Sequence, residues 1–335
     1  MYTYRFEDLV LRMLIGSNEE DVARRLGISA ETVAFIVKNQ LADAKPIDPN
    51  RVIEHIGMDE LSLKKRHQLY ATIMTDLTDP ANPTVLAVVA GRDKAAGVEC
   101  LLKLTEEQRN GILTYRVDMG KAYTAACALL LKQSREVIDR FHVAKLFNKK
   151  VDGLRKKITH QYKATLNKKE LKEFKSLMWE FRRDPETLSL EEKERLAQLF
   201  KVLPALEVLY RFRLRFQEIF DTAPDRETAA RWLRELRTAM SESTLDFSEF
   251  WQTYEEWKTS ILNYFDDHYT SATVEGINNK ARVIIKRSYG IRSANTLWTR
   301  MILDFNLANL SVGKSIQDLR RLTAQIKATF LRYCA

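Results

Sequence analysis

The sequence predicts an α/β protein in which a mixed β-sheet is interrupted by a large all-helical insertion and preceded by a helix-turn-helix. Residues 5–40 have helical periodicity with one break, and residues 52–141 alternate between strand-like and helical patterns. Strand signals then vanish over residues 143–264, which are rich in Lys, Glu, Leu and Arg. A chain of 335 residues exceeds a typical single domain, so we expect a core domain with one or two smaller modules.

The N-terminal helical region contains the pattern of a helix-turn-helix between Glu19 and Lys38. Ala23 is the small residue at which the two helices would cross, and Gly27 can adopt the positive φ of the turn. Ser29 is placed to cap the second helix, whose first turn would then face a DNA groove. An ordinary helical hairpin is the alternative interpretation. The residues that we expect to contact DNA here are Glu31, Thr32 and Lys38.

The region after an Asp- and Pro-containing linker, residues 42–51, is expected to form the sheet. Three β-rich runs separated by turn residues predict an antiparallel meander, and helices and strands alternate after it. The expected strands are 52–59, 69–77, 85–90, 112–118 and 136–141, and the expected helices are 94–104 and 121–132. The predicted order is therefore β-β-β-α-β-α-β.

The helical insertion divides the predicted core domain in two. Prolines at positions 185, 204 and 224 interrupt its helical periodicity, and strong helical patterning resumes at Thr273. The predicted segments are a helix-turn-helix segment (1–45), the first part of the core domain (46–142), the helical insertion (143–264), the last part of the core domain (265–320) and a C-terminal tail (321–335).

The composition favours a polyanionic partner. Lys and Arg number 54 against 45 Asp and Glu, a net charge of +9, which suits nucleic acid or an anionic membrane surface. No apolar run approaches the roughly 20 residues that span a bilayer, and the N-terminus has acidic residues where a signal peptide has basic ones. We therefore expect a cytoplasmic protein with no membrane association. The three cysteines are scattered without a CxxC pair, so no zinc ribbon or disulfide framework is indicated.

Two predicted strands, the first and the fourth, end in an acidic residue. Asp59 closes the first strand and Asp118 closes the fourth. If these strands are parallel neighbours, the two carboxylates meet at the edge of the sheet where α/β proteins place ligands. Close carboxylates repel unless a cation lies between them, and Mg²⁺ or Mn²⁺ is the expected cation for hard oxygen ligands. Taken singly, each Asp has the alternative interpretation of a strand-ending or helix-capping residue.

A third acidic residue, Glu275, lies on the helix that begins near Thr273. Helical spacing predicts a buried face of Val274, Ile277, Ala281, Ile284 and Ile285 and an opposite face of Glu275, Asn278, Asn279, Arg282 and Lys286. Residues 276–300 contain six basic residues and no acidic one, whereas a solvated face usually mixes both signs. We expect Arg282, Lys286 and Arg287 to contact DNA phosphates.

The sequence resembles a known family, the DDE transposases of bacterial insertion sequences, in the branch written ISL-three. The resemblance covers nearly the whole chain and rests on the segments Ile56-Gly57-Met58-Asp59-Glu60, Gly91-Arg92, Val117-Asp118-Met119, Asp139-Arg140-Phe141-His142-Val143 and Glu275-Gly276-Ile277-Asn278-Asn279-Lys280. It implies a ribonuclease H-like fold with a helical insertion between the second and third catalytic residues. The catalytic, metal-binding triad that it implies is Asp59, Asp118 and Glu275.

The resemblance also implies an activity: metal-dependent DNA strand cleavage and strand transfer by a two-metal-ion mechanism. Its cofactor would be Mg²⁺, with Mn²⁺ as a substitute. Its partners would be the double-stranded DNA of the transposon ends and of the target, bound by a homodimer or higher assembly associated with the bacterial nucleoid. His142 matches the family's Asp-x-x-His element and would contact the scissile phosphate or orient a metal-bound water. A structural histidine at a strand end is the alternative.

The sequence departs from the family at its N-terminus. Transposases of this branch usually begin with a cysteine-rich zinc-binding module, and no cysteine precedes Cys100 here. We therefore expect either a shortened member or one whose N-terminal part has been lost. Two other functions compete with transposition: a non-catalytic DNA-binding repressor derived from a transposase, and a structure-specific nuclease of the same fold.

The start of the helical insertion is strongly basic. Residues 145–169 contain nine Lys or Arg and a single acid, Asp152, which is typical of a surface that follows a nucleic-acid backbone. A solvated helix face is the alternative. The tryptophans of the insertion, at positions 179, 232, 251 and 257, are expected to be core residues.

Overall fold

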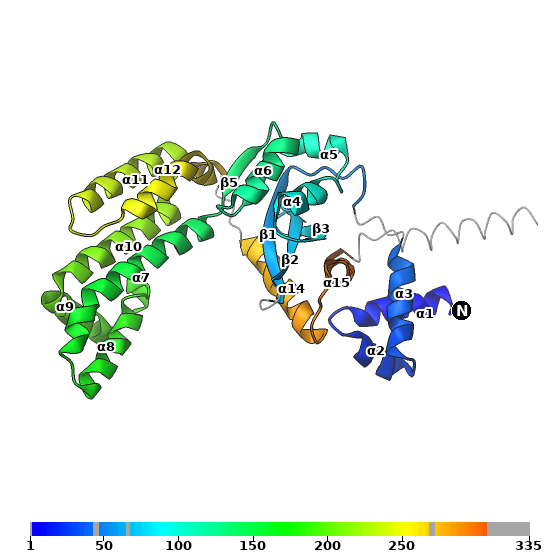
Figure 1. The fold of residues 1–335 in the computed structure, drawn as a ribbon, viewed down its shortest axis with the longest axis horizontal. Coiled ribbons are helices and arrows are strands. Elements are labelled where there is room, and N and C mark those ends of the chain that lie inside the picture. Colours follow the sequence, from blue (N-terminus) through cyan, green and yellow to red (C-terminus); the bar gives the residue numbers. More distant parts are fainter. Residues whose placement is uncertain (1, 43–46, 65–67, 268–271, 307–335) are drawn as a thin grey trace, which may run out of the picture. The chain divides into compact units, whose positions relative to one another are not determined.

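The computed structural model describes residues 2–42, 47–64, 68–267 and 272–306. These residues form two compact units, which we call the sheet unit (Met1–Glu136 and Ser271–Ala335) and the helical unit (Val137–Thr270) (Figure 1). The predicted tail 321–335 and residues 307–320 of the predicted core domain lie outside the described residues, so the predicted segment boundaries stay predictions. Within the described part, no helix is both long enough and apolar enough to cross a membrane.

The sheet unit is built on a five-stranded mixed sheet with the order β3-β2-β1-β4-β5. Its strands are β1 (His55–Lys64), β2 (Leu69–Asp76), β3 (Thr84–Ala90), β4 (Thr114–Val117) and β5 (Arg135–Ile138). The first three strands form an antiparallel meander, as the sequence predicts, and β1 also pairs in parallel with β4. The central strand β1 is therefore the junction between the antiparallel and parallel halves of the sheet.

Two strands end more than one residue away from the predicted position. Strand β1 does not end at Asp59 but continues to Lys64, because its outer half pairs with β2 and places Leu61 in the core at 2% exposure. Strand β5 ends at Ile138 rather than at residue 141, because Asp139 caps the following helix by accepting a hydrogen bond from the Phe141 N–H at 2.9 Å.

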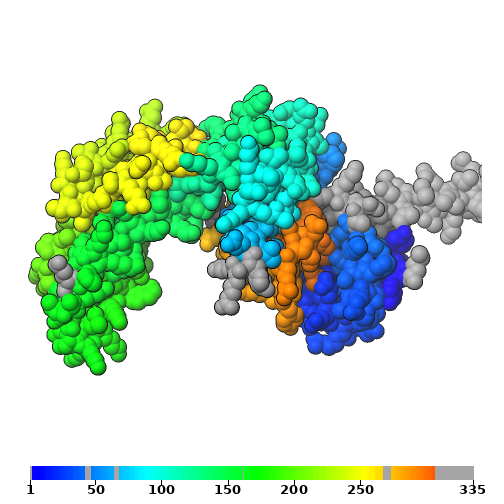
Figure 2. All heavy atoms as spheres, in the orientation of Figure 1, coloured from blue at the N-terminus to red at the C-terminus, as the bar shows by residue number. Residues whose placement is uncertain are grey.

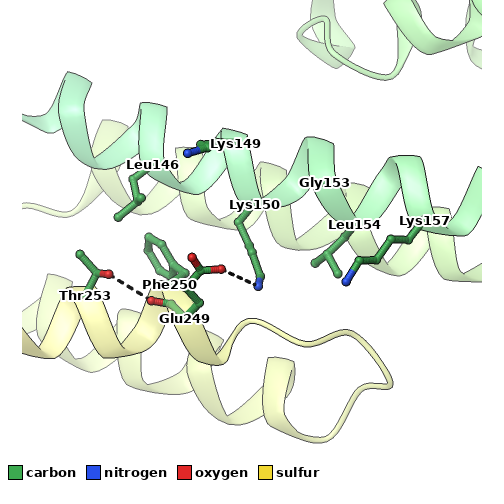
Figure 3. A pocket seen from close by; sticks show the side chains of 9 residues that line it. All are labelled: Leu146, Lys149, Lys150, Gly153, Leu154, Lys157, Glu249, Phe250 and Thr253. Atoms are coloured by element: carbon green, nitrogen blue, oxygen red, sulfur yellow. Dashed lines mark hydrogen bonds and ion pairs between the residues drawn. The ribbon is translucent and has the colours of Figure 1, made fainter.

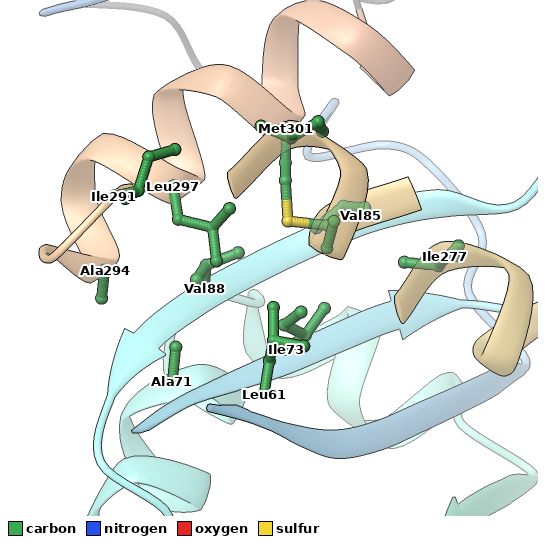
Figure 4. Close-up of a cluster of buried hydrophobic side chains, with 12 residues drawn as sticks. Leu61, Ala71, Ile73, Val85, Val88, Ile277, Ile291, Ala294, Leu297 and Met301 are labelled. Carbon is green, nitrogen blue, oxygen red and sulfur yellow. The ribbon is translucent and has the colours of Figure 1, made fainter. Parts of the chain in front are cut away.

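Helices cover both faces of the sheet. The helices of this unit that follow or border the sheet are α4 (Lys94–Leu101), α5 (Glu106–Gly111), α6 (Lys121–Leu130), α14 (Ala272–Arg287) and α15 (Ala294–Asn306). Helices α14 and α15 pack on one face, where Leu297 and Met301 of α15 point toward Val88 and Val85 of β3 (Figure 4). On the opposite face, the hydroxyl groups of Thr72 on β2 and Tyr123 on α6 are 3.0 Å apart.

Three short N-terminal helices complete the sheet unit: α1 (Tyr4–Leu14), α2 (Glu19–Leu26) and α3 (Ala30–Ala42). The region thus has two breaks rather than the one predicted, because Asn18 caps α2 and Gly27, with φ of 66°, ends it. The helices share a small core with Leu303 of α15, and the α14–α15 segment (orange) lies against them (blue) in Figure 2. Packing onto α15 therefore connects these helices to the sheet.

After the last two residues of β5, which fall within its bounds, the helical unit contains no strand among its described residues, as predicted for residues 143–264. Its helices are α7 (Arg140–Ala164), α8 (Lys168–Glu180), the short 3-10 helix η2 (Pro185–Thr187), α9 (Leu190–Val202), α10 (Pro204–Thr222), α11 (Arg226–Ser241), α12 (Ser248–Leu262) and α13 (Tyr264–Asp267). An aromatic cluster joins α7, α10 and α12: the Phe147 ring stacks on Phe216 at 3.9 Å between centroids and meets Phe250 edge-on at 5.0 Å.

Candidate active site

The pairing of β1 with β4 places two acidic residues at the same level of the sheet. The parallel register pairs His55 with Thr114 and Gly57 with Arg116. The same offset relates Asp59 to Asp118, which directly follows the last residue of β4. Both aspartates are partly exposed, so each carboxylate is accessible from solvent. The continuation of β1 to Lys64 therefore does not change the expected proximity of Asp59 and Asp118.

The two aspartates also affect the pKa of the buried Tyr123 hydroxyl. Burial is the main cause that raises the pKa of the Tyr123 hydroxyl, which is 3% exposed. Negative charge on Glu60, Asp118 and Asp59 raises that pKa further. These three carboxylates therefore lie close enough to this buried side chain to affect its pKa.

Helix α14, which carries Glu275, runs along β1. A Cβ atom placed on Gly57 would lie 2.9 Å from Cγ2 of Val274. Helix α14 therefore approaches β1 at a strand residue that has no side chain. Farther along, Nδ2 of Asn278 donates a hydrogen bond to Oδ2 of Asp59 at 2.5 Å. Four helical residues advance about 6 Å and two strand residues about 6.6 Å, so the two contacts keep helix and strand side by side.

Glu275 lies between these two contacts in the sequence of α14 and is exposed. It precedes Asn278 by three residues, so both side chains project from the same side of the helix. In the described residues, however, no three His, Cys, Asp or Glu side chains are already gathered as ligands around one point. Like charges repel in the absence of a cation, whereas the oxygen donors themselves suit a hard divalent metal. The residues present therefore fit such a metal by chemistry and by backbone placement.

Asp118 is constrained by the glycine that follows it. A Cβ on Gly120 would lie 2.6 Å from Oδ1 of Asp118. Any larger residue at position 120 would displace the carboxylate, because the contact is with the acidic group itself. The absence of a side chain at Gly120 therefore leaves room for the carboxylate of Asp118.

Asn278 is a residue for which the sequence interpretation was wrong. Helical spacing predicts that it lies opposite the buried face, but its side chain is 2% exposed and contacts Asp59. The signal that could have identified its burial is its position four residues after Val274 and three before Ala281, which are on the predicted buried face.

His142 lies in the first turn of helix α7, not at a strand end as predicted. Its Nδ1 atom is 3.5 Å from Oδ2 of Asp139, the residue that caps the helix. His142 belongs to the helical unit, whereas the three acidic residues belong to the sheet unit. The catalytic role implied for this histidine stays a prediction.

The basic residues of α14 differ in their surroundings. Arg282 is exposed and donates a hydrogen bond to Oδ1 of Asn279 at 2.7 Å, and Lys286 is exposed as well. Arg287 instead forms an ion pair with the buried carboxylate of Asp304, and its side chain is 19% exposed. Among the three predicted phosphate contacts, Arg287 is therefore the least accessible.

On α3, the predicted DNA contacts lie on its outer side. Glu31 and Lys38 are exposed, and the Thr32 N–H donates to Oγ of the cap residue Ser29 at 3.2 Å. The sequence interpretation missed Phe35, whose side chain is 61% exposed. An apolar residue four positions after Glu31 and three before Lys38 falls on their stripe, and this spacing was the available signal.

The basic beginning of the helical unit combines structural and accessible cations. Arg155 is 5% exposed and pairs with Asp152, so it is part of the fold. Lys149 and Lys157 instead border a cavity of about 270 Å³ between α7 and α12, where Lys150 pairs with Glu249 (Figure 3). Of the tryptophans in this unit, those at 251 and 257 are buried as predicted, whereas the one at 179 is 68% exposed.

Comparison with known proteins identifies the class to which this site belongs. A family model described as a transposase matches residues 56–301, a span that includes all three acidic residues. The protein is therefore a DNA-processing enzyme that acts in transposition. The chain belongs to the ISL3 family of DDE transposases, which generally use divalent metals and bind DNA.

Two curated relatives support this assignment. The chain is 26% identical over 292 residues to the transposase for insertion sequence element IS1001 of Bordetella parapertussis, covering 87% of this chain and 70% of the relative. It is 21% identical over 318 residues to the transposase for insertion sequence element IS1557 of Mycobacterium tuberculosis, covering 88% and 70%.

Proposed function

We propose that Asp59, Asp118 and Glu275 are the catalytic, metal-binding triad of this transposase. The observation that carries the proposal is the offset shared by β1 and β4, which relates Asp59 to Asp118. The contact between Asn278 and Asp59 brings helix α14, and with it Glu275, to the same strand. Mg²⁺ is the proposed cofactor, with Mn²⁺ as a substitute, because all three ligands are carboxylates.

The fold that we propose for the sheet unit is ribonuclease H-like. Its support is the strand order β3-β2-β1-β4-β5, with an antiparallel meander and a parallel β1–β4 pair. The helical unit enters the chain between Asp118 and Glu275, as the family resemblance implies. We propose the segments 1–45, 46–142, 143–264, 265–320 and 321–335 as the domain organisation on the same grounds.

Strand cleavage and strand transfer would be two in-line displacements at phosphorus. In the first, a water oxygen forms a bond to the phosphorus at the transposon end, and the bond to the 3′-oxygen breaks. The freed 3′-hydroxyl oxygen then forms a bond to a phosphorus of the target, and the bond from that phosphorus to the target's own 3′-oxygen breaks. Two divalent ions held by the triad would neutralise charge on the attacking and leaving oxygens. Arg282 and Lys286 would position the DNA backbone. His142 would position the scissile phosphate or the water that attacks it.

The N-terminal helices are proposed to be a DNA-binding helix-turn-helix. Support comes from the positive φ of Gly27, the cap at Ser29 and the exposed stripe on α3. Glu31 and Thr32 would face the bases, and Lys38 the phosphate backbone. Two transposon ends must be joined to one target, so we propose that two or more protomers act together on DNA.

The experiment that tests the triad is cleavage of a transposon-end duplex in Mg²⁺ by Asp59→Asn, Asp118→Asn and Glu275→Gln. Each substitution removes a ligand charge with little change of shape, and several kcal/mol of lost stabilisation corresponds to about a 10³-fold loss of rate. DNA binding should persist. Glu60→Gln is the matched control, because Glu60 neighbours Asp59 but pairs with Arg92 at 3.6 Å. A variant that keeps near wild-type cleavage would remove its residue from the triad.

A further inference from the structure

We infer that Asn278 is a positioning residue that holds the Asp59 carboxylate in the orientation required for metal binding. The inference rests on the proposed function, because it assigns Asn278 to the same site. It assigns to Asn278 a role that the triad proposal itself does not contain.

The contact itself is specific. Nδ2 of Asn278 lies 2.5 Å from Oδ2 of Asp59, and the two residues are 219 positions apart in the sequence. A carboxylate only accepts hydrogen bonds, so the amide must turn its nitrogen toward Asp59, since the flipped amide would oppose two oxygens. The direction of the hydrogen bond is therefore set by the chemistry of its partner.

Both oxygens of the Asp59 carboxylate are held in this way. Oδ1 accepts a hydrogen bond from the N–H of Glu60 at 2.7 Å, and Oδ2 accepts from Asn278. Each carboxylate oxygen has a second lone pair, so these hydrogen bonds fix the group without using up its capacity to bind a cation. Hydrogen bonds to ligating carboxylates orient them in this manner at metal sites.

Packing alone does not explain an asparagine at position 278. The side chain is 2% exposed, and its Oδ1 atom is buried without a hydrogen-bond partner among the described residues. An unpaired buried acceptor is unfavourable, and an apolar residue of similar shape, such as leucine, would avoid it. The N–H donor facing Asp59 is the feature that an apolar residue cannot supply.

The chain offers a matched control in the next residue. Asn279 lies on the same helix, is exposed, and hydrogen-bonds Arg282 rather than Asp59. Asn278→Leu and Asn279→Leu are therefore the same chemical change, but only Asn278→Leu removes the contact with the Asp59 carboxylate. Asn278→Ala provides a second, smaller replacement in case leucine disturbs folding.

The test is a Mn²⁺ titration of the full chain, monitored by the metal-induced rise in melting temperature and by cleavage of a transposon-end duplex. We expect Asn278→Leu and Asn278→Ala to weaken apparent Mn²⁺ affinity roughly 10- to 100-fold. Cleavage should recover at saturating Mn²⁺. Asn278→Leu should also melt without metal at or above the wild-type temperature, and Asn279→Leu should titrate like wild type.

Comparison with Asp59→Asn separates the two proposals. If Asp59→Asn loses Mn²⁺ binding while both Asn278 variants titrate like wild type, the inference about Asn278 is wrong and the triad stands. If Asp59→Asn itself binds Mn²⁺ like wild type, the proposed metal ligand is wrong. A loss of metal-free stability in both Asn278 variants, with unchanged Mn²⁺ affinity, would assign Asn278 a structural role and overturn the inference.

Discussion

Val274 contacts β1 at a residue that has no side chain: its Cγ2 atom lies 2.9 Å from where a Cβ on Gly57 would stand. Leu77 is nearly as close to the same point, at 3.1 Å, so a side chain at position 57 would meet neighbours from two directions. The separation between β1 and α14 is consequently set by a glycine two residues before Asp59. The position of Glu275 relative to the aspartates depends on this separation.

Gly57→Ala should therefore impair catalysis more than DNA binding. The added methyl group overpacks a closed contact, which costs about 1–3 kcal/mol of folding stability, and it moves α14 away from β1. Cleavage of a transposon-end duplex should fall while duplex binding, measured by gel shift, changes little. Gly153→Ala on α7 is the control, because a Cβ there meets nothing within 4 Å. Unchanged cleavage by Gly57→Ala would show that the close approach is dispensable.

Asp304 should be required to hold the N-terminal helices on α15. Its carboxylate accepts a hydrogen bond from the Gly16 N–H at 3.2 Å and pairs with Arg287. Asp304→Ala leaves a mostly buried guanidinium without its partner, a loss of about 3 kcal/mol for such pairs. Thermal unfolding should show the lower stability. Arg12→Ala, which removes an exposed pair with Asp8, should have little effect.

The basic stretch of α7 should divide into cations that bind DNA and cations that support the fold. Lys149→Ala and Lys157→Ala should each lower the slope of log binding constant against log salt by about 1, without a change in melting temperature. Arg155→Ala should instead reduce thermal stability, because Arg155 is buried against Asp152. Identical salt slopes for wild type and both lysine variants would exclude this surface from DNA contact.

Asp152 should make the helical unit sensitive to acid. Burial raises the pKa of its carboxyl, but hydrogen bonds from three cationic side chains outweigh burial and hold that pKa well below its usual value. The three are Arg155, Lys156 and Arg182. Because the folded-state pKa is depressed, the stabilisation is present above the unfolded-state value of about 4 and is lost as the pH falls below it.

Asp152→Asn is accordingly expected to lower the melting temperature at pH 7, and the difference from wild type should shrink as the pH is lowered below 4. Asp8→Asn is a suitable control, since its partner Arg12 is exposed. A difference in melting temperature between Asp152→Asn and wild type that stayed constant across this pH range would contradict the prediction.

Phe35 and Thr32 should govern sequence preference, whereas Lys38 should govern affinity. An exposed phenylalanine beside Glu31 is suited to apolar contact with a thymine methyl group in the major groove. Phe35→Ala and Thr32→Ala should therefore change which sequences are selected from a random duplex library. Lys38→Ala should weaken binding to all sequences alike. If Phe35→Ala and Thr32→Ala both selected the same sequences as wild type, the helix-turn-helix proposal would be contradicted.

The parts of the fold that local pattern determines were predictable from the sequence. The meander, helices α4 and α6 and the strand-free insertion all have periodicity that is visible in short windows, whereas the short helix α5 was not predicted. The end of β5 was missed because Asp139 serves as a helix cap, a function that competes with strand extension at the same residue. The extension of β1 beyond Asp59 depends on pairing with β2, which local pattern alone underestimates.

The candidate site was predictable only in part, for a related reason. Asp59 and Asp118 could be placed together because each lies at or near the end of the β1–β4 pairing. The burial of Asn278 depends on a contact with a strand 219 residues earlier, and a polar residue on an amphipathic helix is ordinarily assigned to the exposed face. The close approach of Val274 to Gly57 is likewise a tertiary contact that no local pattern encodes.

The most direct test of the central claim is the metal dependence of cleavage by Asp59→Cys and Asp118→Cys. A thiolate is a poor ligand for Mg²⁺, which requires hard oxygen donors, whereas Mn²⁺ is a softer ion that accepts it better. Both variants should be inactive in Mg²⁺ and regain measurable cleavage in Mn²⁺, and Glu60→Cys should be active in both metals. Equal activity of the Asp59 and Asp118 variants in the two metals would contradict direct metal ligation by these residues.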